Sequence, residues 1–101
     1  MTIKLTEIYE CKSAQMSTAP HQKMFKTREV YVNPAHVVCL RTDDLVLRTL
    51  RETADPLAHH KEFTRVFINR GHTGIDLTVV GHPSQIEEAF KSANQKQLLK
   101  G

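Results

Sequence analysis

Six histidines and two cysteines are the residues of this 101-residue chain that could bind a metal ion. His36 and Cys39 lie three residues apart, and on a strand side chains at that spacing point to opposite faces of the sheet. The two could share one ion only if His36 belongs to the preceding turn. His59 and His60 are adjacent and diverge in the same way in regular structure. The sequence has no Cys-x-x-Cys pair, no His-x-x-x-His pair and no Asp-rich loop. We therefore predict that the protein holds no metal ion and no other cofactor.

The spacing of nucleophiles does not indicate catalysis either. Neither Cys11 nor any serine lies in the glycine-flanked turn that presents a catalytic nucleophile. Cys39 lies in an apolar run, where a thiol is unreactive. The segment Gly71–Gly74 is too short for a phosphate-binding loop and precedes a strand rather than a helix. We predict that the protein is not an enzyme. Both cysteines fit free thiols, with a single disulfide as the alternative.

Basic side chains interleaved with aromatic ones suggest a surface for single-stranded nucleic acid. Phe63, Arg65 and Phe67 alternate along a predicted strand and would project from one face, where stacking and phosphate contacts can act together. In the competing interpretation, both phenylalanines pack under a neighbouring helix and Arg65 extends to water. The basic residues of the nucleic-acid hypothesis are Lys23, Lys26, Arg28, Arg65 and Arg70.

Apolar side chains give the leading hypothesis, which is a protein-interaction surface. Exposed Phe63 and Phe67, or exposed Leu98 and Leu99, would form a patch that a monomer does not leave bare. The leucine pair also fits the last contact of a helix. The edges of a small open sheet can pair with a partner or with a second copy. We predict a non-catalytic binding or regulatory protein that acts through a protein partner or as a homo-oligomer, with nucleic-acid binding as the alternative.

Composition indicates one domain over residues 1–101. The chain is 40% hydrophobic and 25% charged, with a formal net charge of +3, as expected of an ordinary soluble protein. No apolar run approaches the ~20 residues that span a bilayer, and Met1–Glu10 does not resemble a signal peptide. We expect a cytoplasmic protein of a bacterium or a phage, without membrane contact and without a small-molecule substrate.

The pattern of apolar residues predicts an α+β fold, with a small, mainly antiparallel sheet. Residues 3–9 and 27–32 are predicted strands, and residues 11–26 between them a mobile loop. Val37–Leu40 is a continuous apolar run, which predicts a strand buried on both faces. Residues 43–54 fit a short inserted helix, capped by Thr42 or Asp43, and they also fit a strand.

The last forty residues carry the clearest signals. Residues 63–69 and 75–80 form a predicted hairpin around a five-residue loop with two glycines, in which Thr64, Val66 and Ile68 share a face with the apolar residues of the partner strand. Ser84 and Glu87 then have capping-box spacing, which begins a C-terminal helix. The helix is predicted to pack on one face of the sheet through the apolar stripe Ile86, Ala89, Phe90 and Ala93.

Three segments, taken in order, resemble the small FlbD-type flagellar proteins and related uncharacterised bacterial and phage proteins. They are Ile3–Thr6, Tyr31–Val38 and the end of the hairpin with the start of the helix, Val79–Glu88. The resemblance implies a compact β-rich unit with a terminal helix, no known catalytic centre, and a link to motility or to roles not yet defined. It assigns no functional residue. Residues 11–26 and 41–62 depart from the family pattern.

Overall fold

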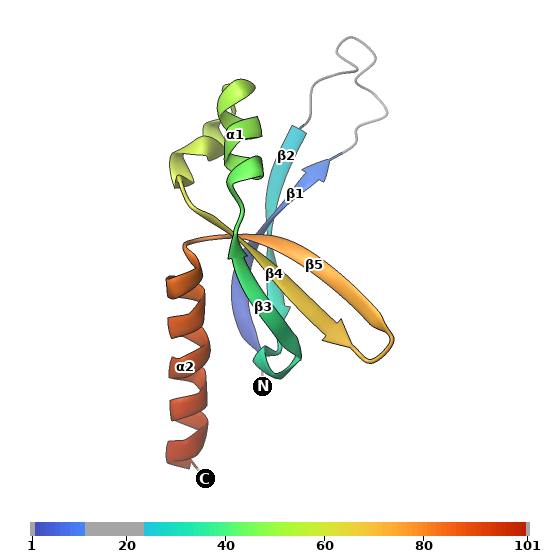
Figure 1. Cartoon of the computed structure of the whole chain (residues 1–101). Helices are drawn as coiled ribbons and strands as arrows, with labels where there is room; N and C mark the ends of the chain where they lie inside the picture. The colour runs from blue at the N-terminus through green and yellow to red at the C-terminus, as the bar shows by residue number, and fades with distance from the viewer. Residues whose placement is uncertain (1, 12–23, 101) are drawn as a thin grey trace.

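The computed structural model describes residues 2–11 and 24–100, and within them the side chains of all but residues 70 and 94–100. Most of the predicted loop over 11–26 lies outside the described residues, but its two ends belong to strands (Figure 1). In chain order the elements are β1 (Ile3–Cys11), β2 (Met24–Val32), the 3-10 turn η1 (Pro34–His36), β3 (Val37–Thr42), α1 (Asp44–Glu52), the 3-10 turn η2 (Pro56–His60), β4 (Phe63–Arg70), β5 (Thr73–Val80) and α2 (Pro83–Lys100).

The protein is α+β, and its described strands form one antiparallel sheet in the order β2-β1-β5-β4-β3. The β1–β2 ribbon joins the β3–β4–β5 meander through a short pairing, Glu7 opposite Val79 and Ile8 opposite Thr78. Because this pairing is short, the β4–β5 hairpin diverges from the β1–β2 ribbon toward its tip (Figure 1). Among the described strands, β2 and β3 form the edges of the sheet. No helix of the described residues is both long enough and apolar enough to cross a membrane.

The predicted hairpin of β4 and β5 is confirmed, with a tighter turn than the sequence suggested. Gly71 takes a φ of +72°, a conformation that favours glycine, whereas Gly74 already belongs to β5. Alternate residues of a strand share a face, so the register decides which side chains meet. The predicted shared face is confirmed by the pairs Thr64↔Val79, Val66↔Leu77 and Ile68↔Ile75.

Two apolar clusters form the core, and they lie on opposite faces of the sheet because strand residues alternate. The first cluster includes Ile86 of α2, with Phe90 packed against it, and its buried members are Leu5, Val32, Val66, Ile68, Val79 and Ile86. The second cluster joins Leu50 of α1 to Ile8 and Phe63. Each helix thus contributes to a different cluster, and α1 reaches only the end of the sheet where β4 begins (Figure 1).

The prediction of a strand buried on both faces at Val37–Leu40 is wrong. This segment belongs to β3, which is an edge strand, and none of its residues is fully buried. The pairing with β4 shifts between Val37 and Cys39, which leaves Val38 as an extra residue with 66% of its surface exposed. A bulge of this kind turns a side chain away from the regular alternation.

Both helices begin with side-chain caps. Of the two alternatives for residues 43–54, the helix is correct, and Asp43 is its N-cap. The predicted capping box of Ser84 and Glu87 is wrong by two residues, because α2 begins at Pro83 and the side chain of Gln85 accepts the His82 N–H at 2.9 Å. Glu87 instead pairs with Lys91 at 3.0 Å one turn later, which raises the pKa of that lysine.

Candidate functional site

Two rows of side chains cross β3, β4 and β5 on the face of the sheet that α1 covers only at one end. Residues directly opposite each other in antiparallel strands project to the same face. One row is Cys39, Phe67 and Asp76, and the next is Arg41, Arg65 and Thr78. We call these six residues the open face. Phe63 lies on the same face of β4, two positions before Arg65, but α1 covers it there.

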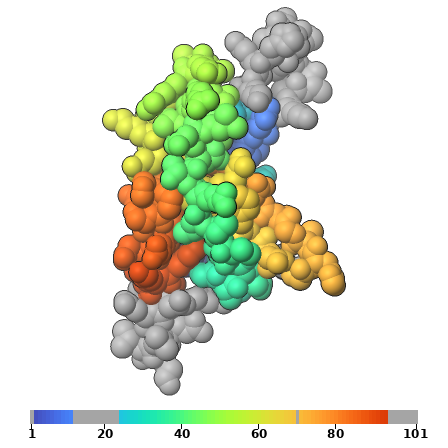
Figure 2. All heavy atoms as spheres, in the orientation of Figure 1, coloured from blue at the N-terminus to red at the C-terminus, as the bar shows by residue number. Residues whose placement is uncertain are grey.

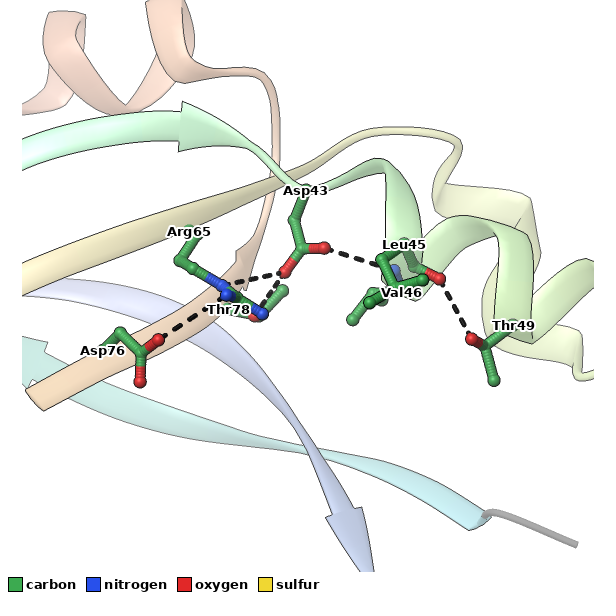
Figure 3. Close-up of polar contacts among 7 residues, drawn as sticks. All are labelled: Asp43, Leu45, Val46, Thr49, Arg65, Asp76 and Thr78. Atoms are coloured by element: carbon green, nitrogen blue, oxygen red, sulfur yellow. Dashed lines mark hydrogen bonds and ion pairs between the residues drawn. The ribbon is translucent and has the colours of Figure 1, made fainter.

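Asp43 fixes the position of α1 at one end of the open face. Its Oδ1 accepts the backbone N–H of Val46 at 3.2 Å, and its Oδ2 accepts the hydroxyl of Thr78 at 2.8 Å (Figure 3). The same Oδ2 lies 3.4 Å from Nε of Arg65. The side chain is only 4% exposed, so its carboxylate caps α1 and joins it to both strands of the hairpin away from solvent.

Arg65 lies between two carboxylates on the open face. Besides Asp43, its Nη1 is 3.7 Å from Oδ2 of Asp76 (Figure 3). The Arg65–Asp76 pair is half exposed and long, so it contributes little to stability. The two carboxylates also balance the positive charge of Arg65, which weakens the attraction of this side chain for a phosphate group or another anion.

The open face contains two shallow depressions that meet at Arg41 and Phe67. The larger measures about 660 Å³ and lies between β3 and the tip of the β4–β5 hairpin, which stands out from the body of the molecule in Figure 2. The smaller measures about 290 Å³ and ends at the first turn of α1. The guanidinium carbon of Arg41 lies 5.8 Å from the centre of the Phe67 ring, within the range of a cation–π contact.

Exposed apolar side chains border these depressions on both sides. Val38, 66% exposed, lines the larger one. Ile75 borders the same depression but projects to the other face of the sheet, where it pairs with Ile68. Leu45, 62% exposed, lines the smaller one. With Phe67, Val38 and Leu45 form a small apolar surface that runs from β3 to the first turn of α1. Surface patches of this kind commonly mark contacts with other molecules.

Phe63 and Phe67, predicted together, have different environments. Phe63 is 1% exposed and packs with Leu50 and Ile8. It is therefore part of the core, and the prediction that it contacts a partner is wrong, because α1 covers that end of the sheet. Phe67 is only partly buried and lines both depressions.

The predicted basic residues with described side chains do not share one surface. Lys26 and Arg28 lie on β2, at the opposite edge of the sheet from the open face that carries Arg65. Arg28 donates from Nε to Glu7 at 2.8 Å, and this pairing raises its pKa. The remaining predicted site residues fall outside the described side chains: Lys23, Arg70, Leu98 and Leu99.

Sequence reasoning missed Val38 and Leu45. Val38 was hidden in an apolar run, and only the bulge turns it outward. Leu45 belongs to the apolar alternation of the strand alternative for residues 43–54, whereas in the helix that forms it faces solvent. A signal was present for Asp43, whose place before a helical pattern suits an N-cap, although its contacts with β4 and β5 depend on the fold.

Both cysteines are free thiols. Among the described residues, no three His, Cys, Asp or Glu side chains gather as a metal site requires. The expectation that His59 and His60 diverge is wrong, because in the turn η2 their ring centres lie 4.0 Å apart with the ring planes tilted by 36°. The ring of His60 also packs edge-on against Phe63. Burial lowers the pKa of His60, and the charge of His59 lowers it further.

The lowered pKa of His60 predicts that acid destabilises the fold. In the unfolded chain the imidazole of His60 takes up a proton near pH 6.5, whereas in the folded protein it does so only at a lower pH. The free energy of unfolding therefore falls as the pH drops below about 7 toward the pKa of the folded state. We expect the Tm of the wild type to fall more between pH 7 and pH 5 than the Tm of His60→Gln. His72→Gln, in the exposed hairpin turn, serves as the control and should follow the wild type. An unchanged slope in His60→Gln would contradict this assignment.

Comparison of the chain with protein-family models, with curated proteins and with solved structures found no match.

Proposed function

We propose that this protein is a non-catalytic binding module that recognises another protein through the open face. The supporting observation is the pair of exposed apolar side chains beside Phe67, which are Val38 and Leu45. Aromatic side chains and arginine are enriched at protein interfaces, and here Arg41 lies beside the partly buried ring of Phe67. The depressions are shallow, which suits the side chains of a protein partner better than an enclosed small molecule.

Nucleic-acid binding remains the second candidate, and the charges of the site favour it less. Phosphate contacts need positive charge that is free to replace counterions. Arg65 already lies between Asp43 and Asp76, and Asp44 also lines the smaller depression. Of the basic side chains on the open face, Arg41 alone has no carboxylate within 4.0 Å among the described residues.

The proposal extends to a regulatory role in the cytoplasm of a bacterium or its phage, either with a different protein or by self-association. The resemblance to FlbD-type proteins stays a prediction, and a role in motility follows only if that resemblance holds. Light scattering of the purified protein separates the two modes of assembly. A homo-oligomer that persists in 0.5 M salt and dissociates in Phe67→Glu supports self-association through the open face.

A partner captured from cell extract has to be purified and tested against matched variants. We expect Phe67→Ala to weaken the purified complex at least tenfold, because the ring is central to the surface. Tyr31→Ser removes an aromatic ring that is 63% exposed on β2, and it should leave the affinity unchanged. Equal binding by Phe67→Ala, or affinity for single-stranded oligonucleotides that falls steeply with salt and with Arg65→Ala, would overturn the proposal.

A further inference from the structure

The two edges of the sheet differ in how well they are protected. β3 is short and contains the bulge at Val38, and both features hinder pairing with another strand. β2 has nine residues, pairs with β1 over its whole length without a shift, and contains no proline. No described strand pairs with its outer side. β2 is therefore the edge at which a further strand can add.

The charges along β2 are arranged by face. Lys26 and Arg28 project to one face, since they are two residues apart, and Glu29 projects to the other. Glu7 and Tyr9 of β1 hold the Arg28 guanidinium in place, with the Nε hydrogen bond to Glu7 and a distance of 4.2 Å to the centre of the Tyr9 ring. A guanidinium has five N–H donors, and the Arg28 side chain is 58% exposed. It can therefore donate hydrogen bonds to a second carboxylate at the outer edge of β2.

A second copy of β2 is a poor occupant of this edge. When a two-fold axis relates two antiparallel copies of β2, the axis passes through one residue position, and that residue lies opposite the same residue of the second copy. A centre at Arg28 or at Glu29 places that charge opposite itself, and a centre at Thr27 places Lys26 opposite Arg28 of the second copy. Like charges directly opposite one another destabilise a sheet. The central registers of a homodimer are thus all unfavourable.

We propose that β2 binds an extended acidic segment of another protein by strand addition, with carboxylates two residues apart opposite Lys26 and Arg28. β1 provides the same complementarity on the other side, where Glu7 lies opposite Arg28. Backbone hydrogen bonds supply the affinity in such complexes, and alternate side chains supply the specificity. This site is separate from the open face and goes beyond the proposed function.

The experiment uses a nine-residue peptide with blocked ends, titrated into the isotope-labelled full chain and followed by amide NMR. The peptide places glutamates opposite Lys26 and Arg28, a lysine opposite Glu29, and threonine or valine elsewhere. We expect it to shift the β2 amide signals in 0.1 M salt. A charge-inverted peptide and a peptide with a central proline should bind at least tenfold more weakly. No shift in β2, or equal binding of either control peptide, would overturn the proposal.

Variants of the protein locate the contact. Lys26→Glu changes an exposed side chain, so the fold should persist, and we expect it to weaken the acidic peptide about fivefold. The same variant should bind better to a peptide with lysine at the facing position. Phe67→Ala should not change peptide binding, which distinguishes this site from the open face. Loss of peptide binding in Phe67→Ala with no effect of Lys26→Glu would refute the assignment to β2.

Discussion

Replacing Phe63 with alanine is expected to lower the free energy of unfolding by about 3–5 kcal/mol, the usual cost of removing a fully buried aromatic side chain. Phe63 is 1% exposed and is the largest fully buried side chain of the described residues. It joins β4 to Leu50 of α1 and to Ile8 of β1, so its loss leaves a cavity between the sheet and the helix. Chemical denaturation followed by circular dichroism measures the change.

Phe67→Ala is the matched comparison, because the two rings lie on the same face of the same strand. We expect a loss of about 1 kcal/mol or less at Phe67, since this ring is partly exposed and its removal opens no enclosed cavity. A similar loss of unfolding free energy in Phe63→Ala and Phe67→Ala would contradict the assignment of Phe63 to the core and of Phe67 to the surface. The contrast also matters for function, because only a variant that remains folded can test the open face.

Asp43→Ala is expected to cost about 2–3 kcal/mol, the second-largest effect. The variant removes the N-cap of α1, worth about 1 kcal/mol, and a charge-assisted hydrogen bond from Thr78, typically ~1.5–3 kcal/mol before relaxation. It also leaves Arg65 with Asp76 as its remaining carboxylate among the described residues. Thermal and chemical denaturation measure the loss, and the helical signal shows whether α1 frays.

Asp43→Asn separates geometry from charge. An amide oxygen still accepts the Val46 N–H or the Thr78 hydroxyl, so we expect the cost to fall to about 1 kcal/mol. Thr78→Val tests the same contact from the other side, and its effect should largely disappear in the Asp43→Ala background. Additive losses in the double variant would show that the two side chains do not act together.

The elements of the fold were largely predictable, because their signals are local. The hairpin of β4 and β5 follows from alternation and from glycine in the turn, and the predicted face-sharing of Val66 and Ile68 agrees with the observed register. The helical alternative for residues 43–54 is correct because Asp43 provides a cap and Leu50 provides an apolar contact. The capping box of α2 was misplaced, because the imidazole and N–H of His82 take part in a cap two residues earlier.

The candidate site was predictable only in part. Alternation alone placed Phe63, Arg65 and Phe67 on one face of β4. It does not reveal where α1 ends on that face, and that boundary makes Phe63 a core residue and leaves Phe67 accessible. The same holds for charge, because the partners of Arg28 and Arg65 come from β1, from β5 and from the turn before α1.

By itself, the sequence determined the α+β class, the β4–β5 hairpin and the terminal helix, since backbone propensity and apolar periodicity act between residues close together in the chain. The tertiary structure decided the order of the strands, the edge positions of β2 and β3, and the pairing of buried Asp43 with Thr78, 35 positions later. These features depend on contacts between distant residues, and a single sequence carries no local signal for which strands become neighbours.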